Sequence, residues 1–209
     1  MRLSNLSFFL LAVIIGLAAC KDNGSAGEEV VKVVGEDYVS AISKHRKETD
    51  DFFLSPNSPL PDSVRKDFTG LKYYDIDTNF RVMAKYEEIP NGPVFKIQAT
   101  GSIADTYKTM GKLHFLLNGI KYSLEVYRNE SYVGKGQEVY FIPFYDLTNG
   151  NETYAGGRYI DMHTLNGENI ILDFNNAYNP YCLYNHEYSC PVPPLQNNLK
   201  TEIRAGERL

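Results

Sequence analysis

The spacing of apolar residues predicts one helix near the start of the chain. Between residues 28 and 50, apolar or partly apolar side chains recur every three to four positions, the period of an amphipathic helix. Three prolines then follow within six residues and interrupt regular structure. We therefore expect residues 28–64 to form a helix and a proline-rich connection. The predicted apolar stripe consists of Val34, Tyr38, Ala41, Ile42 and His45.

From Arg81 onward the pattern changes to short β-rich runs separated by turns. An Asn-Gly pair at 118–119 lies between two such runs and is a strong hairpin signal. Further Asn-Gly pairs at 149–150 and 166–167 join the later runs, so successive hairpins predict an antiparallel meander. The fold class expected is mainly β, a sandwich or partly open barrel, with residues 65–209 forming the β-rich domain.

The N-terminus has a different pattern, one continuous apolar run. It extends from Phe8 to Ala19 behind a basic start at Arg2. A run of this length is well short of the ~20 residues that a membrane-spanning helix needs. Residues 1–19 are therefore predicted to be a signal peptide.

The end of this run, Leu-Ala-Ala-Cys, resembles the lipobox of bacterial lipoproteins. The resemblance implies that Cys20 is acylated and becomes the first mature residue, followed by a flexible polar tether over residues 20–27. An ordinary secretory signal is the alternative. Asp22 does not directly follow the cysteine, so the expected location is the cell envelope, with attachment to the outer membrane through the lipid.

Composition excludes one class of partner. The formal net charge is −5 and there is no basic run, whereas nucleic-acid binding requires clustered lysine and arginine. The chain has 16 tyrosines and no tryptophan. Tyrosine favours strands and also sugar- or peptide-binding surfaces, so the partner is expected to be a small molecule, a glycan or a protein.

Polar residues around the turn at 149–150 form a candidate pocket. One interpretation is an anion site in which Arg158 donates to a carboxylate ligand. The other is structural: Asp146 and Thr148 bond the turn, and Arg158 pairs with Asp146 or Asp173. Asx residues just after the last strand would extend the same cleft or satisfy backbone groups. The candidate residues are Asp146, Glu152, Tyr154, Arg158, Asp173, Asn175 and Asn179.

Two cysteines near the C-terminus leave three interpretations open. In an oxidising compartment Cys182 and Cys190 are expected to form a disulfide. Cys182, His186 and Cys190 would also form part of a zinc site, although no fourth ligand has a diagnostic spacing. The third interpretation is a free thiol nucleophile, activated by His186 or His163.

Three stretches together resemble a known family. They are "FYDLTNGNETYAGGRYID" (144–161), "LDFNNAYNPYC" (172–182) and "SCPVPPLQNNLKTEIRAGE" (189–207), and "RKDFTGLKYYDIDTNFRV" (65–82) fits the start of the same core. The resemblance is to an uncharacterised bacterial and archaeal family, domain-of-unknown-function family 1684. It covers residues 65–207 and implies no activity, cofactor or site residue.

Two functional hypotheses follow. The favoured one is a lipid-anchored β-rich binding or envelope-associated module without catalytic turnover and without a cofactor. It rests on the anchor, the tether, the tyrosine-rich strands and the absence of a Gly-rich phosphate loop or a Gly-x-Ser-x-Gly elbow from the sequence. The alternative is a hydrolase that uses the polar pocket or a cysteine nucleophile.

Overall fold

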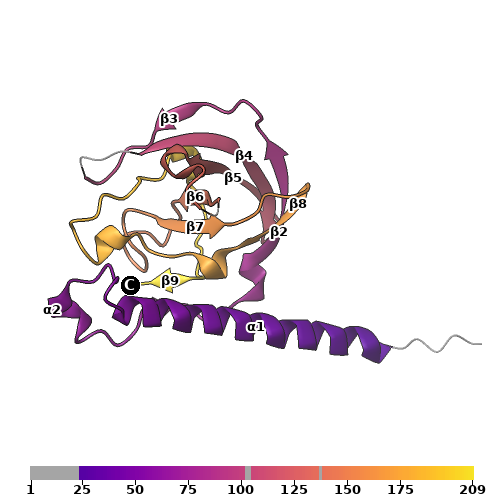
Figure 1. Cartoon of the computed structure of the whole chain (residues 1–209). Coiled ribbons are helices and arrows are strands. Elements are labelled where there is room, and N and C mark those ends of the chain that lie inside the picture. Colours follow the sequence, from indigo (N-terminus) through magenta and orange to yellow (C-terminus); the bar gives the residue numbers. More distant parts are fainter. Residues whose placement is uncertain (1–23, 102–104, 137) are drawn as a thin grey trace, which may run out of the picture. The chain divides into compact units, whose positions relative to one another are not determined.

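The computed structural model of the 209-residue chain describes residues 24–101, 105–136 and 138–209, with side chains from Asp37 onward. The chain divides into two units, Met1–Asp37 and Tyr38–Leu209. Helix α1 (Gly24–Leu54) begins in the first unit and ends in the second, where the described strands lie (Figure 1). No helix among the described residues is long and apolar enough to cross a membrane. The predicted signal peptide and Cys20 lie outside the described residues.

Helix α1 starts earlier than predicted, and the residues that it buries differ in part from the predicted apolar stripe. It begins at Gly24, within the segment expected to be a tether. In the second unit Ile42 and Phe53 are its buried apolar residues, whereas Ala41 and His45 of the predicted stripe are exposed. The buried face is set by Phe53, which contacts the rings of Phe68, Tyr181 and Tyr184.

The β-rich part is one curled antiparallel sheet and a short two-stranded pair, which confirms the predicted fold class (Figure 1). The order in the large sheet is β7-β6-β5-β4-β2-β8, with β3 paired to β4, and the small pair is β1-β9. The bounds are β1 Lys72–Tyr73, β2 Arg81–Glu88, β3 Val94–Lys96, β4 Thr106–Leu117, β5 Ile120–Asn129, β6 Tyr140–Phe144, β7 Arg158–Met162, β8 Asn169–Asp173 and β9 Glu207–Arg208. The short helices are α2 Asp62–Arg65 and the 3₁₀ turns η1 Thr78–Phe80, η2 Glu130–Tyr132, η3 Phe174–Asn176, η4 Tyr181–Leu183 and η5 Leu195–Asn197.

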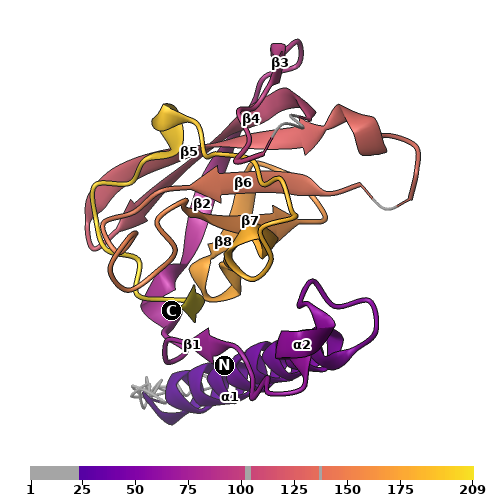
Figure 2. The same cartoon turned by 90° about the vertical axis from the view of Figure 1, so that its left-hand side faces the viewer.

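The predicted meander holds for four strands and then fails. Strands β4, β5, β6 and β7 follow one another as antiparallel neighbours, and Asn118 and Gly119 form the β4–β5 turn with φ of 51° and 77°. Strand β8 does not pair with β7 across the Asn-Gly turn at 166–167; it pairs with β2 at the opposite edge. Figure 2 shows β8 beside β2. The expected final hairpin is therefore wrong, because a turn signal does not determine which strands pair over long range.

The two faces of the sheet bury different residues. One face packs a continuous aliphatic and phenylalanine core from strands β2, β4–β8, closed by Phe174 and by the C-terminal residues Leu199, Ile203 and Ala205. Each fully buried side chain of this kind stabilises the fold by about 1.5–3 kcal/mol. The opposite face, over β3 to β7, carries mainly aromatic residues in two smaller clusters. This aromatic face forms the wall of the cavity described below.

Candidate functional site

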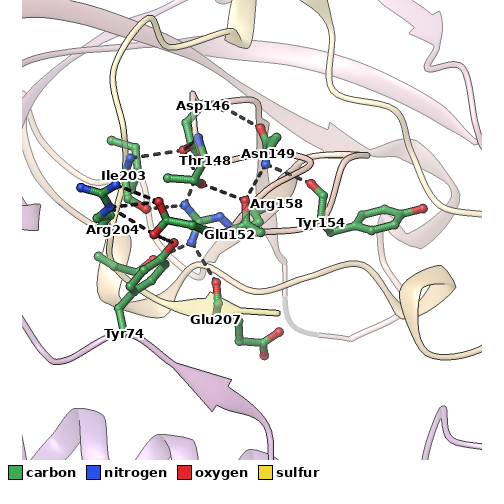
Figure 3. Close-up of polar contacts among 12 residues, drawn as sticks. Tyr74, Asp146, Thr148, Asn149, Glu152, Tyr154, Arg158, Ile203, Arg204 and Glu207 are labelled. Carbon is green, nitrogen blue, oxygen red and sulfur yellow. Dashed lines mark hydrogen bonds and ion pairs between the residues drawn. The ribbon is translucent and has the colours of Figure 1, made fainter.

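Asp146 and Arg158, two residues of the predicted pocket, form an ion pair that is closed off from solvent. Arg158 Nη2 lies 2.9 Å from Asp146 Oδ2, and each side chain is 0% exposed. Arg158 Nη1 also donates to the carbonyls of Ala205 and Glu207, and Nη2 donates to that of Ile203 (Figure 3). Both terminal nitrogens of the guanidinium are therefore bound to protein acceptors, whereas Nε is buried without a hydrogen-bond partner among the described residues, and the group attaches the C-terminal segment to strand β7.

The other oxygen of Asp146 is also committed. Oδ1 accepts hydrogen bonds from the backbone N–H of Thr148 at 2.8 Å, from its hydroxyl at 2.6 Å and from the N–H of Ile203 at 3.2 Å. Together with the Arg158 contact, these bonds satisfy both oxygens of a carboxylate that has no exposed surface. Asp146 and Arg158 are thus structural residues that hold a turn and the chain end together.

The side chains of Glu152 and Tyr154 do not join this ion pair, and each has its own partners. Glu152 forms a two-pronged ion pair with Arg204, Nη2 to Oε1 at 2.8 Å, and accepts the hydroxyl of Tyr74 at 3.1 Å. The Arg204 bond is the main reason that the pKa of Glu152 is lowered. Tyr154 instead accepts a weak 3.8 Å bond from Cys182 Sγ. Glu152 and Tyr154, although close in sequence, therefore make separate side-chain contacts.

Asp173 is the last residue of strand β8, Asn175 and Asn179 follow it, and the side chains of Asp173 and Asn175 bond groups around η3. The carboxylate of Asp173 accepts the hydroxyl of Tyr38 at 2.8 and 3.0 Å and the N–H of Asn175 at 3.0 Å. Asn175 Nδ2 donates to the carbonyl of Asp77 at 2.8 Å. Asn179 is buried, and its N–H donates to Glu207. Of the seven candidate residues, only Asn175 borders the cavity described next.

The two cysteines lie together as buried free thiols. The N–H of Cys182 donates to Cys190 Sγ at 3.1 Å, and both pack against Tyr159. Burial, then a bond with Cys182, raises the pKa of Cys190 to about 12. His186 is exposed, and among the described residues no group of three or more His, Cys, Asp and Glu side chains is placed to hold a metal ion. The disulfide stays a prediction.

A cavity with a volume of about 810 Å³ lies against the aromatic face of the sheet. Its wall includes a row of rings from β4, β6, β7 and the segment after η3. Tyr107 stacks on Phe141 at 5.6 Å between centroids, Phe141 meets Tyr159 edge-on at 4.7 Å, and Tyr159 meets Tyr178 edge-on at 5.6 Å. These four residues are called the aromatic row below.

Tyrosine hydroxyls of the aromatic row are neutral and largely bound. Burial raises the pKa of Tyr107, Tyr159 and Tyr178, so the phenols keep their protons at physiological pH. Tyr159 donates to the carbonyl of Pro191, and Tyr178 donates to Asp161 Oδ2 at 3.0 Å. The rings are therefore fixed in orientation and offer their faces and edges to the cavity.

Carboxylates and a histidine border the row. Asp161 opens onto the cavity from β7, and surrounding protein raises its pKa through desolvation, although the Tyr178 bond and His163 act in the opposite direction. Asp105 accepts the amide of Asn129 at 2.9 Å. Asp105, Asn129, Asp161 and His163 all line the cavity. The site thus combines apolar ring surfaces with a few polar groups, as ligand cavities do.

Strand alternation explains how β7 supplies this site. Arg158 and Ile160 face one side and Tyr159 and Asp161 face the other, because successive side chains in a strand alternate. Cross-strand pairing places Phe141 of β6 opposite Asp161. The sequence analysis missed this set, and the available signal was the polar Asp161 two positions after Tyr159 within a strand.

A smaller cavity of about 490 Å³ adjoins the first and shares with it Tyr107, Asn129, Tyr132, Phe141 and Asp161. Its other wall comes from residues of β5 and the loop after η2, including Arg128 and Lys135. Arg128 is engaged by Glu130 and Glu138 at 2.9 and 2.8 Å. The five shared residues therefore lie between two connected spaces.

Comparisons with known proteins agree with this fold. Residues 66–208 match a family described as "Protein of unknown function (DUF1684)". The solved structures that are similar include the solution NMR structure of an uncharacterized protein of Haloarcula marismortui, with 35% identity and a TM-score of 0.67, over 84% of this chain and 96% of that one. No curated protein matches the chain. The comparisons thus give a fold and a family, with no activity attached.

Proposed function

The chain belongs to the DUF1684 family, and we propose that it is a ligand-binding module of the cell envelope that holds a small organic molecule against the aromatic row without turning it over. The observation that carries this proposal is the cavity itself. Its volume of about 810 Å³ lies within the roughly 300–1,000 Å³ of small-molecule sites. Phe141 and three tyrosines supply ring surface, and Asp105, Asp161 and Asn129 supply polar contacts.

The contacts of the earlier candidate residues favour binding over hydrolysis. Asp146 and Arg158 have no exposed surface, so neither side chain can reach a substrate without a change in the fold. A thiol acts as a nucleophile in its thiolate form. With its pKa raised to about 12, Cys190 holds its proton at neutral pH. Neither half of the hydrolase hypothesis gains support from these contacts.

The envelope location in the proposal rests on the N-terminal sequence. The apolar run and Leu-Ala-Ala-Cys predict acylation at Cys20. Lipid attachment through several acyl chains would keep the module at a membrane surface, since each buried methylene contributes about 0.8 kcal/mol. The anchor would confine the cavity to the compartment in which its ligand is captured.

A single introduced tryptophan tests the binding proposal. The chain has no tryptophan, so Tyr132→Trp places one emitting group at the cavity wall. Tyr132 is 68% exposed and lines both spaces, which makes the change tolerable. The matched control is Leu195→Trp, at a position that is 84% exposed and outside the cavity wall.

The full chain with each tryptophan is titrated with a library of neutral, cationic and anionic small molecules. We expect at least one compound to shift the emission of the Tyr132→Trp protein saturably and to leave the Leu195→Trp protein unchanged. Phe141→Ala, in the Tyr132→Trp background, should weaken that response because it removes the ring that contacts both Tyr107 and Tyr159. No saturable response from any compound, or equal responses from both tryptophan positions, would overturn the proposal.

A further inference from the structure

The aromatic row is bordered by two carboxylates, Asp105 and Asp161, whose hydrogen-bond donors are uncharged. Asp161 accepts a bond from the Tyr178 hydroxyl and Asp105 accepts one from the Asn129 amide, and both donors are neutral. Within the described ranges 37–101, 105–136 and 138–209, no lysine, arginine or histidine lies within ion-pair distance of either carboxylate. We propose, on the basis of the function proposed above, that the ligand carries an organic ammonium group bound between these carboxylates and the aromatic row.

Both carboxylates belong to one end of the cavity. Asp161 lies directly across from Phe141 in the β6–β7 pairing, and Phe141 stacks on Tyr107. Tyr107 is paired in turn with Asn129, whose amide holds Asp105. Asp105 and Asp161 are near enough to Tyr107 for each to contribute to the raised pKa of its phenol, after burial. An ammonium placed over these rings would therefore lie among both negative charges.

The nearest basic side chains do not neutralise Asp105 and Asp161. Arg128 borders the smaller cavity, but its guanidinium is bound to Glu130 and Glu138. His163 is the basic group of the β7 end, and it lowers the pKa of Asp161 only against a larger opposing effect of burial. A ligand cation would thus supply the charge that this end of the cavity lacks.

The other basic residues of the wall are at the helix side of the cavity. His45 and Arg46 come from α1, and the Arg46 guanidinium lies 4.5 Å over the ring of Tyr73 and donates to the carbonyl of Tyr74 at 2.9 Å. The Arg46 guanidinium repels an ammonium from that side. The ammonium is accordingly assigned to the end made by β4, β6 and β7.

The chemistry of the wall selects an organic cation over a metal ion. In the described part of the chain no three His, Cys, Asp or Glu side chains converge as a metal site requires. The wall also contains the rings of the aromatic row, and the negative quadrupole of a ring face attracts an ammonium while its carbon atoms contact alkyl groups. Aromatic rings together with carboxylates are the combination that recognises alkylammonium compounds.

The test compares a cation with a neutral molecule of the same shape. Choline and benzylammonium are titrated into the full chain by calorimetry, beside 3,3-dimethylbutan-1-ol, which replaces the choline nitrogen by carbon, and a neutral sugar. We expect at least one ammonium compound to bind saturably at millimolar or lower concentration. 3,3-Dimethylbutan-1-ol should bind at least about tenfold more weakly than choline, the typical difference made by a contact to a charged group.

Charge-removing variants locate the ammonium. Asp161→Asn and Asp105→Asn keep the shape and one acceptor, and each should weaken ammonium binding by roughly tenfold or more. Glu87→Gln removes the same charge from an exposed position outside the cavity wall and should leave affinity unchanged. Circular dichroism and unfolding curves check that the variants fold. If one aspartate variant does not fold, the affinity of the other aspartate variant tests the proposal.

Each outcome separates the ammonium proposal from the binding proposal. If the neutral alcohol or sugar binds as tightly as the cations, or if neither Asp→Asn change weakens binding, the ammonium proposal fails and the cavity keeps its binding role. If no ammonium compound binds while other library members respond at Tyr132→Trp, the ammonium proposal again fails alone. If nothing binds in either experiment, both proposals fail.

Discussion

At the scale of single residues, identical side chains have opposite roles according to their surroundings. The carboxylate of Asp146 is enclosed and takes part in an ion pair and three further hydrogen bonds. Asp161 opens onto the cavity and accepts one phenol hydroxyl. The first is therefore expected to determine stability and the second to determine ligand affinity.

The enclosed ion pair gives a stability prediction. Asp146→Ala leaves the Arg158 guanidinium charged and buried without its counter-ion, which costs about 3–5 kcal/mol of unfolding free energy. Glu152→Ala removes a carboxylate from the half-exposed pair with Arg204 and should cost much less. Urea denaturation of both variants measures the difference. Equal losses for Asp146→Ala and Glu152→Ala would show that enclosure of the pair contributes nothing.

The carboxyl of Glu207 predicts a pH dependence of stability. Burial raises its pKa from 4.5 to about 7, against the opposing bonds from the Asn179 N–H and the Tyr184 hydroxyl. The folded state therefore holds the proton more tightly than the unfolded state. Its contribution to stability is complete below pH 4.5 and is lost as the pH rises through about 7.

Glu207→Gln removes this titration and keeps an acceptor oxygen. The unfolding free energy of the natural chain should fall relative to that of Glu207→Gln by on the order of 3 kcal/mol between about pH 4.5 and 8.5. Denaturation curves of the two proteins at both pH values provide the measurement. A constant difference between them would mean that Glu207 does not titrate in this range.

The candidate site shows how far residue types alone can be interpreted. The sequence offered Arg158 with Asp146 or Asp173 as partners, and the structure pairs it with Asp146. Burial decides between a ligand site and a structural pair, and burial depends on the C-terminal segment that folds over the pair. No local sequence pattern predicts that the C-terminal segment covers the pair. The same residue types therefore fit both a ligand site and a structural ion pair, and only the three-dimensional surroundings distinguish the two.

At the scale of elements, turn residues predict which consecutive strands form a hairpin. They do not predict which strands far apart in the sequence pair with each other. Asn118 and Gly119 adopt the positive φ values of a tight hairpin, so β4 and β5 were predictable from two residues. The pairing of β8 with β2 joins residues about ninety positions apart. The aromatic row draws on three strands and a loop, and its members were individually visible only as strand-favouring tyrosine and phenylalanine.

The chain end provides a prediction at this scale. Gly206 has φ of 76°, and a Cβ there would collide with the carbonyl of Ala177. Gly119 has nearly the same φ, 77°, with nothing within 4 Å of its added Cβ. Gly119→Ala should therefore cost about 1 kcal/mol from backbone conformation alone. Gly206→Ala should cost clearly more, because the C-terminal segment must move.

Thermal and urea unfolding of Gly119→Ala and Gly206→Ala separate the two effects. A larger loss for Gly206→Ala supports the close packing of the C-terminal segment on Ala177. Indistinguishable losses would indicate that this segment adapts without cost, and would weaken the structural role assigned to its contacts with Arg158.

At the scale of the whole molecule, the chain is proposed to combine a lipid anchor with a binding cavity. Cys20 lies outside the described residues, so acylation there is a prediction from sequence. Expressed as the full chain in a Gram-negative bacterium fed an alkyne-tagged fatty acid, the protein should carry the tag and sediment with membranes. Cys20→Ser should lose the tag. An unlabelled natural chain, or a labelled Cys20→Ser chain, would contradict the anchor.

The central claim is that the cavity beside the aromatic row is the binding site. The most direct measurement is backbone-amide NMR of the full chain, titrated with the tightest compound from the library. The account predicts that the largest shift changes fall on cavity residues, among them Asp105, Asn129 and Asp161. Shift changes centred away from the cavity, for example at Met83 and Ile171, which are exposed cross-strand partners on β2 and β8 outside the cavity wall, would contradict it.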